Sequence, residues 1–309
     1  MERKINMGHS VKTIERPLDY KLQLHIFETD EDYARGSILI LHGMAEHYER
    51  YFGFIDALNN VGYDVYIYNH RGHGTDLKEK ELGFFAKKNG DEVVIEDAVA
   101  VMKYVYENKR SERCAIFGHS MGSLITRNVI QRFDKMDCAL ICGTGFMSDA
   151  ICKTGMFVSN VISFFYGPEH KSPLMKKLTF NKDYKKNCTR TPNDWLTKDE
   201  KIVDAYNNDP YCGFLCSSSF YHDLISITYK ACHNIEKTRH DMPILIASGA
   251  DDPVGAFGKG IEQLYNKYKE LGFKSVSMKL YDTDRHELLN ETDKDRVISD
   301  FIKFFESNL

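Results

Sequence analysis

The sequence predicts an α/β protein with a mostly parallel, doubly wound sheet and an inserted helical cap. Three observations support this prediction: short aliphatic runs alternate with amphipathic segments, several runs end in glycine, and one long stretch lacks the alternation. Strands that alternate with helices are typical of a parallel sheet covered on both faces. The 309 residues, 42% of them hydrophobic, suffice for one such domain with a full core.

The strands are expected in a simple order along the chain. Residues 10–28 alternate apolar and polar side chains and predict two short strands joined by a turn. Further strands are then expected at 37–43, 63–70, 114–118, 139–145, 243–249 and 275–282. The segment 37–43 is a continuous aliphatic run, which is typical of a strand buried on both faces. The helices between them are expected at 46–61, at 91–109, just after Ser120, at 258–271 and from about 293.

The alternation stops between residues 146 and 240. These roughly 95 residues are too many for one loop in a compact domain. They begin with an apolar helical stretch at 150–166 and continue through a turn-rich part that holds four prolines. We therefore expect a core made of 1–145 and 241–309, with 146–240 forming a helical cap over the strand ends.

Charge and cysteine content exclude several classes of protein. A net charge of −4 gives no basic face for nucleic acid. The N-terminal residues lack the apolar stretch of a secretory signal, and no run approaches the ~18 apolar residues of a membrane span. The eight cysteines form no CxxC pair and no zinc-type spacing with histidines, and Cys212 and Cys216, four residues apart, are interpreted as semi-buried thiols. A cytoplasmic protein without a bound metal is expected.

A serine lies where a nucleophile is expected. The pattern G-H-S-M-G at 118–122 falls between a predicted strand and a predicted helix. A serine in such a sharp turn is strained, and flanking glycines remove side chains that would clash. The turn exposes the Ser120 hydroxyl at the carboxyl edge of the sheet, while the N–H of Met121 faces a developing oxyanion. This context predicts the α/β-hydrolase fold with Ser120 as nucleophile.

Chain order selects the base. In this fold the nucleophile, the acid and the histidine follow one another along the chain. Of twelve histidines, His286 alone follows the strand at 243–249, and it lies in the loop after the last strand. His286 is therefore the predicted general base. The loop after 37–43 is expected to supply a second oxyanion donor, the N–H of Met44.

The acid and the remaining histidines are less sharply defined by order. Asp251 and Asp252 directly follow the strand at 243–249, and spacing alone does not choose between them. Asp282 and Asp284 are more distant alternatives. Histidines in loops often bond neighbouring backbone, and a structural interpretation on this ground applies to His42, His70 and His73.

Five motifs together resemble the monoacylglycerol lipase and lysophospholipase-like branch of the α/β hydrolases. They are LHGMAEHYERY (41–51), YNHRGHGTD (68–76), GHSMG (118–122), SGADDPVG (248–255) and RHELLNE (285–291). The resemblance covers most of the chain. It implies a carboxylic-ester hydrolase that needs no cofactor and acts on a lipid or another small ester.

The resemblance also implies roles for single residues. The acid of the family corresponds to Asp252, and its oxyanion donors correspond to Met44 and Met121. Glu46 and Arg50 would shape a pocket for the polar alcohol part of a glycerol ester, although a helix-start carboxylate in a surface ion pair explains them equally well. Two residues depart from the family pattern, and both bear on substrate choice. Ala45 stands where the lipases often have glycine, and Asn69 stands where they have aspartate.

The apolar helix of the cap allows two interpretations. Its large side chains would either form a wall for an acyl chain, with contact to membranes or micelles, or pack on the core. These side chains are Met156, Phe157, Val161, Phe164 and Phe165.

Several functions therefore compete. The leading one is cleavage of monoacylglycerols or lysophospholipids through an acyl-serine. The others are a carboxylesterase or thioesterase for short acyl chains, a peptidase, and a non-catalytic ligand receptor on the same scaffold. A peptidase needs a carboxylate cluster for the substrate's amine, and the cap offers no obvious one.

Overall fold

The computed structural model describes residues 8–309 and contains an eight-stranded sheet within them. The strands are β1 (His9–Arg16), β2 (Tyr20–Phe27), β3 (Gly36–Leu41), β4 (Tyr63–Tyr68), β5 (Cys114–His119), β6 (Cys138–Cys142), β7 (Ile244–Gly249) and β8 (Val276–Tyr281). Their order is β1-β2-β4-β3-β5-β6-β7-β8. The neighbours from β4 to β8 pair in parallel, and β1 and β2 form an antiparallel edge. The predicted mostly parallel sheet is confirmed.

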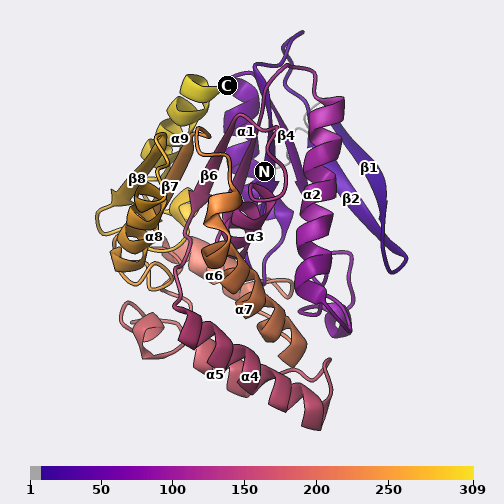
Figure 1. The fold of residues 1–309 in the computed structure, drawn as a ribbon, viewed down its shortest axis with the longest axis vertical. Helices are drawn as coiled ribbons and strands as arrows, with labels where there is room; N and C mark the ends of the chain where they lie inside the picture. The colour runs from indigo at the N-terminus through magenta and orange to yellow at the C-terminus, as the bar shows by residue number, and fades with distance from the viewer. Residues whose placement is uncertain (1–7) are drawn as a thin grey trace.

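Helices cover both faces of this sheet (Figure 1). On one face, α1 (Phe52–Asn60) and α9 (Lys294–Asn308) share a core cluster with the strands. On the other face lie α2 (Gly90–Asn108), α3 (Met121–Val129) and α8 (Lys259–Glu270). Because every central strand is buried along its whole length, its aliphatic run serves both layers.

Four α-helices follow β6 and precede β7. They are α4 (Asp149–Tyr166), α5 (Pro173–Thr179), α6 (Glu200–Asn208) and α7 (Ser218–His233). In Figure 1, α4 lies along the lower edge of the molecule, away from the strands. Helix α7 contacts α2, α3 and α4, and its Phe220 and Ile227 belong to the core cluster of the sheet. The segment expected as a cap thus shares part of its core with the rest of the protein.

Two predicted boundaries differ from the structure because loops replace their ends. The helix expected at 46–61 consists of a 3-10 turn at Tyr48–Tyr51 followed by α1. The residues before that turn are held in a loop in which Ala45 has φ 53°. The strand expected at 139–145 ends at Cys142, because Gly143 turns the chain with φ 58°. No helix within residues 8–309 is long and apolar enough to cross a membrane.

Candidate active site

The turn after β5 is a strained nucleophile elbow. Ser120 has φ 54° and ψ −120°, an unfavourable conformation for a residue with a side chain. A Cβ on Gly118 would lie 2.3 Å from the carbonyl oxygen of Gly122, and a Cβ on Gly122 would lie 2.0 Å from that of Leu41. Only glycine fits at both positions, so the sequence pattern follows from the close packing of α3 on β3 and β5.

Ser120, His286 and Asp252 form a continuous hydrogen-bonded chain across the carboxyl ends of three strands. Nε2 of His286 lies 2.8 Å from Oγ of Ser120, and Nδ1 lies 2.9 Å from Oδ2 of Asp252. Asp252 is fully buried and also accepts bonds from the Ser248 hydroxyl and the Val254 N–H. These bonds fix the carboxylate, which in turn fixes the imidazole with one nitrogen toward the serine.

The structure separates the other candidate carboxylates from His286. Asp284 is buried, but its Oδ1 accepts a bond from Lys198 at 2.5 Å. Asp282 is exposed at the surface. The N–H of Asp251 bonds the carbonyl of Asp284, so Asp251 lies in the turn that places Asp252. Among these carboxylates, the hydrogen bond to His286 belongs to Asp252.

Burial and nearby charge shift the pKa values of the two histidines of the site in opposite directions. Burial lowers the pKa of His286, but the charge and hydrogen bond of Asp252 outweigh it and leave this pKa raised above 6.5. His119 lies beside it, with ring centroids 4.7 Å apart. Burial, assisted by the nearby His286, lowers the pKa of His119 to about 4. His119 is thus neutral at pH 7, whereas the pKa of His286 is shifted in the opposite direction.

Two structural histidines support the loop after β3. Nδ1 of His42 bonds the carbonyl of Gly43 at 2.8 Å, and Nε2 of His73 accepts the N–H of Ala45 at 3.1 Å. Burial lowers the pKa of both His42 and His73 to about 3, so both stay neutral. A Cβ on Gly43 would lie 3.2 Å from Cβ of Ser120. The loop that carries Met44 therefore abuts the nucleophile.

Met44 and Met121 both line the cavity beside Ser120. Met121 begins α3, so its N–H belongs to the helix end with the positive partial charge. This position suits an oxyanion donor, as does the start of the loop at Met44.

Asn69, one of the departures from the family pattern, accepts the N–H of Tyr48 through Oδ1 at 2.9 Å and so supports the 3-10 turn.

Glu46 and Arg50 are part of a larger buried network. Arg50 donates to Oε2 of Glu46 at 2.6 Å and to both carboxylate oxygens of Glu287 at 2.6 and 2.7 Å. Glu46 also accepts the N–H of Gly43 at 2.5 Å and the hydroxyl of Tyr51 at 2.8 Å. Burial raises the pKa of Glu46, but Arg50 opposes it and the net direction is downward, so this carboxylate is charged.

This network corrects the expectation for Arg50. The residues that line the main cavity include Glu46 and Glu287, whereas Arg50 lines a smaller cavity of about 630 Å³ between α1 and α9. The donors of Arg50 point to two carboxylates because burial of the guanidinium requires charged partners. The ion pair of the alternative interpretation is present, but it is buried and does not lie at the surface. Sequence reasoning missed Glu287, although it directly follows His286.

A large cavity extends from Ser120 into the segment between β6 and β7. Its volume is about 1300 Å³, and apolar side chains from α4, α5 and α7 form most of its wall. From α4 it is lined by Ala150, Ile151, Thr154, Gly155 and Val158.

The large side chains of α4 that were expected to form a wall of the acyl cavity lie on another face of the helix. Phe157, Phe164 and Phe165 are 69%, 82% and 72% exposed, and Val161 is also exposed. These side chains neither line the cavity nor pack on the core. The helix presents its smaller residues to the cavity and to α7, where space is limited, and its aromatic residues to solvent.

The fold, the elbow and the hydrogen-bonded Ser120-His286-Asp252 chain define a serine hydrolase of the α/β-hydrolase fold. The family described as "Serine aminopeptidase, S33" matches residues 32–293. The chain belongs to this family. Both the predicted fold and the predicted class of enzyme are confirmed.

Individual relatives agree with this assignment. A monoglyceride lipase homolog of monkeypox virus is 22% identical over 275 residues, covering 85% of each chain. Among solved structures, a lipase in an open form has a TM-score of 0.87 at 23% identity, covering 97% of this chain and 98% of its own. A thermostable carboxyl esterase from Bacillus coagulans, in complex with glycerol, has a TM-score of 0.85 at 25% identity, with 98% and 99% covered. The resemblance to monoglyceride lipases is thus confirmed.

Proposed function

We propose that this protein hydrolyses monoacylglycerols or lysophospholipids through an acyl-serine intermediate. One observation carries the proposal: the bonded Ser120-His286-Asp252 chain lies at one end of a 1300 Å³ cavity with a mostly apolar wall. Such a cavity suits an acyl chain, because burial of each CH₂ group contributes about 0.8 kcal/mol. We assign Ser120 as nucleophile, His286 as general base and Asp252 as the acid that orients it.

The reaction follows from these positions. Nε2 of His286 takes the proton of Ser120 as its oxygen attacks the ester carbonyl, and the N–H groups of Met44 and Met121 stabilise the oxyanion. His286 then returns the proton to the leaving alkoxide, which departs as the alcohol. A water molecule, deprotonated by the same imidazole, attacks the acyl-serine and releases the fatty acid. No step requires a cofactor.

We assign the alcohol end of the substrate to the side of the cavity where Glu46 and Glu287 lie. Both carboxylates line the cavity near Ser120, and hydroxyl groups donate well to charged acceptors. Arg50 would act on the substrate only through Glu46 and Glu287, which it holds in place.

Hydrolysis rates over a panel of esters test this function. The panel holds monoacylglycerols, lysophosphatidylcholine, and nitrophenyl esters from acetate to palmitate, with Ser120→Ala as control. The proposal predicts the highest kcat/KM for long acyl chains and no turnover by the variant. Activity confined to short esters would leave the triad in place and contradict the lipid assignment.

The same panel addresses the other functions. A short-chain esterase or thioesterase would prefer acetate or butyrate esters. A peptidase needs free carboxylates for the substrate's amine, whereas Glu46 and Glu287 are both paired with Arg50. A ligand receptor on this scaffold would turn over no ester. The observed pairing and the apolar wall support the lipid hydrolase over these alternatives.

We also propose that the outer face of α4 and α5 contacts membranes or micelles. This face exposes Phe157, Phe164, Phe165, Leu174 and Leu178, a larger apolar group than scattered surface residues usually form. Co-sedimentation with phosphatidylcholine vesicles measures the contact. Replacement of Phe164 and Phe165 by serine should weaken sedimentation, while hydrolysis of dispersed short esters stays unchanged.

A cytoplasmic location is proposed on the state of the cysteines. All eight are free thiols, and seven of them are buried. Free thiols in this number suit a reducing compartment. Fractionation of cells that produce the protein would test the location.

A further inference from the structure

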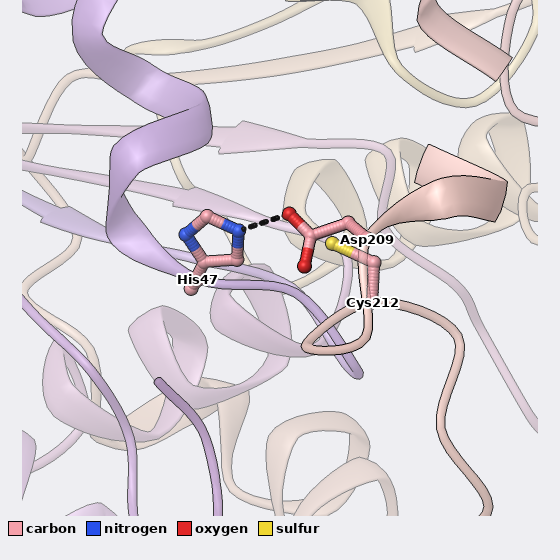
Figure 2. Close-up of side chains that lie close together, drawn as sticks. All are labelled: His47, Asp209 and Cys212. Atoms are coloured by element: carbon pink, nitrogen blue, oxygen red, sulfur yellow. Dashed lines mark hydrogen bonds and ion pairs between the residues drawn. The ribbon is translucent and has the colours of Figure 1, made fainter. Parts of the chain in front are cut away.

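One group of side chains within residues 8–309 places three metal-type ligand atoms close together: His47, Asp209 and Cys212 (Figure 2). Nε2 of His47 lies 3.0 Å from Oδ2 of Asp209, and all three ligand atoms lie within 4.8 Å of one another. His47 directly precedes the 3-10 turn before α1, whereas Asp209 and Cys212 follow α6. None of the three residues of the triad belongs to the group, and His47 lies in the oxyanion loop, three residues after Met44.

We propose that His47, Asp209 and Cys212 bind a divalent cation of the zinc type, with water completing its coordination. Imidazole nitrogen, carboxylate oxygen and thiolate sulfur are the ligands that Zn²⁺ takes in proteins. Bonds of about 2.0–2.3 Å at tetrahedral angles separate ligand atoms by roughly 3.4–3.6 Å. The His47–Asp209 pair would open by about half an ångström, and the sulfur would approach by up to about an ångström.

The burial of the group suits a site of this kind. The side chain of His47 is only 6% exposed, and that of Asp209 is 29% exposed. The Nε2 of the buried imidazole is hydrogen-bonded to Asp209, and the partly exposed carboxylate leaves a path for the ion and for a water ligand. Figure 2 shows Nε2 of His47 directed at the carboxylate, with the thiol of Cys212 beside it.

The surrounding charge favours a cation despite the proximity of Arg50. Asp209, Glu46 and Glu287 carry three negative charges, and Arg50 carries one positive charge that the two glutamates already neutralise. The local balance is therefore two negative charges when the imidazole is neutral. A divalent ion would offset these two charges, and the Cys212 thiolate that it binds would leave one negative charge.

Occupation of the site would fasten two functional segments together. The carbonyl of Ala45, in the oxyanion loop, accepts bonds from the Gly213 N–H at 2.9 Å and from the Tyr206 hydroxyl at 3.2 Å. Cys212 immediately precedes Gly213, and His47 follows Ala45 by two residues. The His47–Asp209 hydrogen bond already joins the oxyanion loop to the segment after α6, and a metal ion here would replace it with a coordinated link that also includes Cys212.

Cobalt serves as an optical probe for the site. We would treat the full-length protein with a chelator, titrate it with Co²⁺, and follow the sulfur-to-cobalt charge-transfer band and the visible bands of tetrahedral Co²⁺. The proposal predicts saturation at one equivalent and loss of the bands when Zn²⁺ displaces Co²⁺. Cys212→Ser should abolish the charge-transfer band. Cys188→Ser is the matched control, because Cys188 is the most accessible thiol and thus the place for unspecific binding.

A second variant keeps the test independent of the thiol. Asp209→Asn should weaken Zn²⁺ binding by more than about tenfold, the loss typical even for an outer partner of a metal site. Circular dichroism and ester hydrolysis would show that both variants fold. The absence of a saturating band, its persistence in Cys212→Ser, or its loss in Cys188→Ser would each overturn the proposal. These readouts do not depend on the substrate, so failure of the proposed function would leave them unaffected.

Discussion

The network around Arg50 yields the sharpest stability prediction. Arg50 makes three short hydrogen bonds to Glu46 and Glu287, whose side chains are each only 5% exposed. In Arg50→Met, two buried carboxylates lose their only shared cation and repel one another. Loss of one partner from a buried ion pair costs about 3–5 kcal/mol. We expect the free energy of unfolding at pH 7 to fall by that amount.

The dependence of this loss on pH identifies its cause. In the native protein the pKa of Glu46 is lowered, so its contribution to stability is present above its unfolded pKa and is lost as the pH falls through the native value. Without Arg50, burial is the largest remaining influence, and it raises that pKa. Protonation of Glu46 as the pH falls then removes the repulsion between the two carboxylates in the variant. The difference between Arg50→Met and the native protein should shrink between pH 7 and pH 5.

Guanidinium denaturation at both values of pH, followed by tryptophan fluorescence and circular dichroism, measures this effect. The matched control is the triple variant Glu46→Gln, Arg50→Met and Glu287→Gln, which removes the charges along with their cation. It should recover most of the lost stability, because a buried triad replaced as a whole is often neutral in free energy. A loss below about 1 kcal/mol, or a loss that is equal at both pH values, would refute the electrostatic reasoning.

Three further predictions concern the catalytic centre. In a pH–rate profile, the acid limb of kcat/KM should lie above pH 6.5, because His286 must be neutral to act as base and its pKa is raised. Asp252→Asn should move this limb to lower pH and reduce the plateau of kcat/KM on the order of 10⁴-fold. Gly122→Ala should prevent folding to the active state, since its Cβ would lie 2.0 Å from a carbonyl oxygen, whereas Gly53→Ala in α1, with open space around it, should be tolerated in thermal unfolding. Val158→Trp should lower kcat/KM for palmitate but not acetate esters, while Trp at the solvent-exposed Val161 should change neither.

The fold was predictable because its signals are local. The central strands β3, β5, β6 and β7 are mostly apolar and fully buried, and Gly118 and Gly122 mark a turn in which no other residue fits. Chain order alone then singled out His286. The choice between Asp251 and Asp252 was not local, since it depends on a turn in which Asp251 bonds the backbone of Asp284. The resemblance to a family favoured Asp252, and the geometry agrees.

Other features depend on contacts that no local pattern encodes. Helix α4 has apolar residues around most of its circumference, so its sequence does not show which face lies over the cavity. The packing of α7 decides that face, as the contact of Gly155 with Ile225 shows. Likewise, His47 and Asp209 are 162 residues apart, and their pairing follows from the path of the chain after α6.

Hydrogen bonds tie the residues after α5 to the loop that carries His286. Glu287 donates its N–H to the carbonyl of Leu196 at 2.7 Å, and Arg285 bonds the carbonyl of Asp194 at 2.5 Å. These residues thus help to fix the position of the catalytic loop.

Helices α4 and α5 carry the exposed residues Ile151 and Leu178, which also line the cavity. A residue that is both exposed and part of the cavity wall marks the place where the cavity opens to solvent. Ile151 and Leu178 therefore mark an opening of the cavity beside the apolar outer face of α4 and α5.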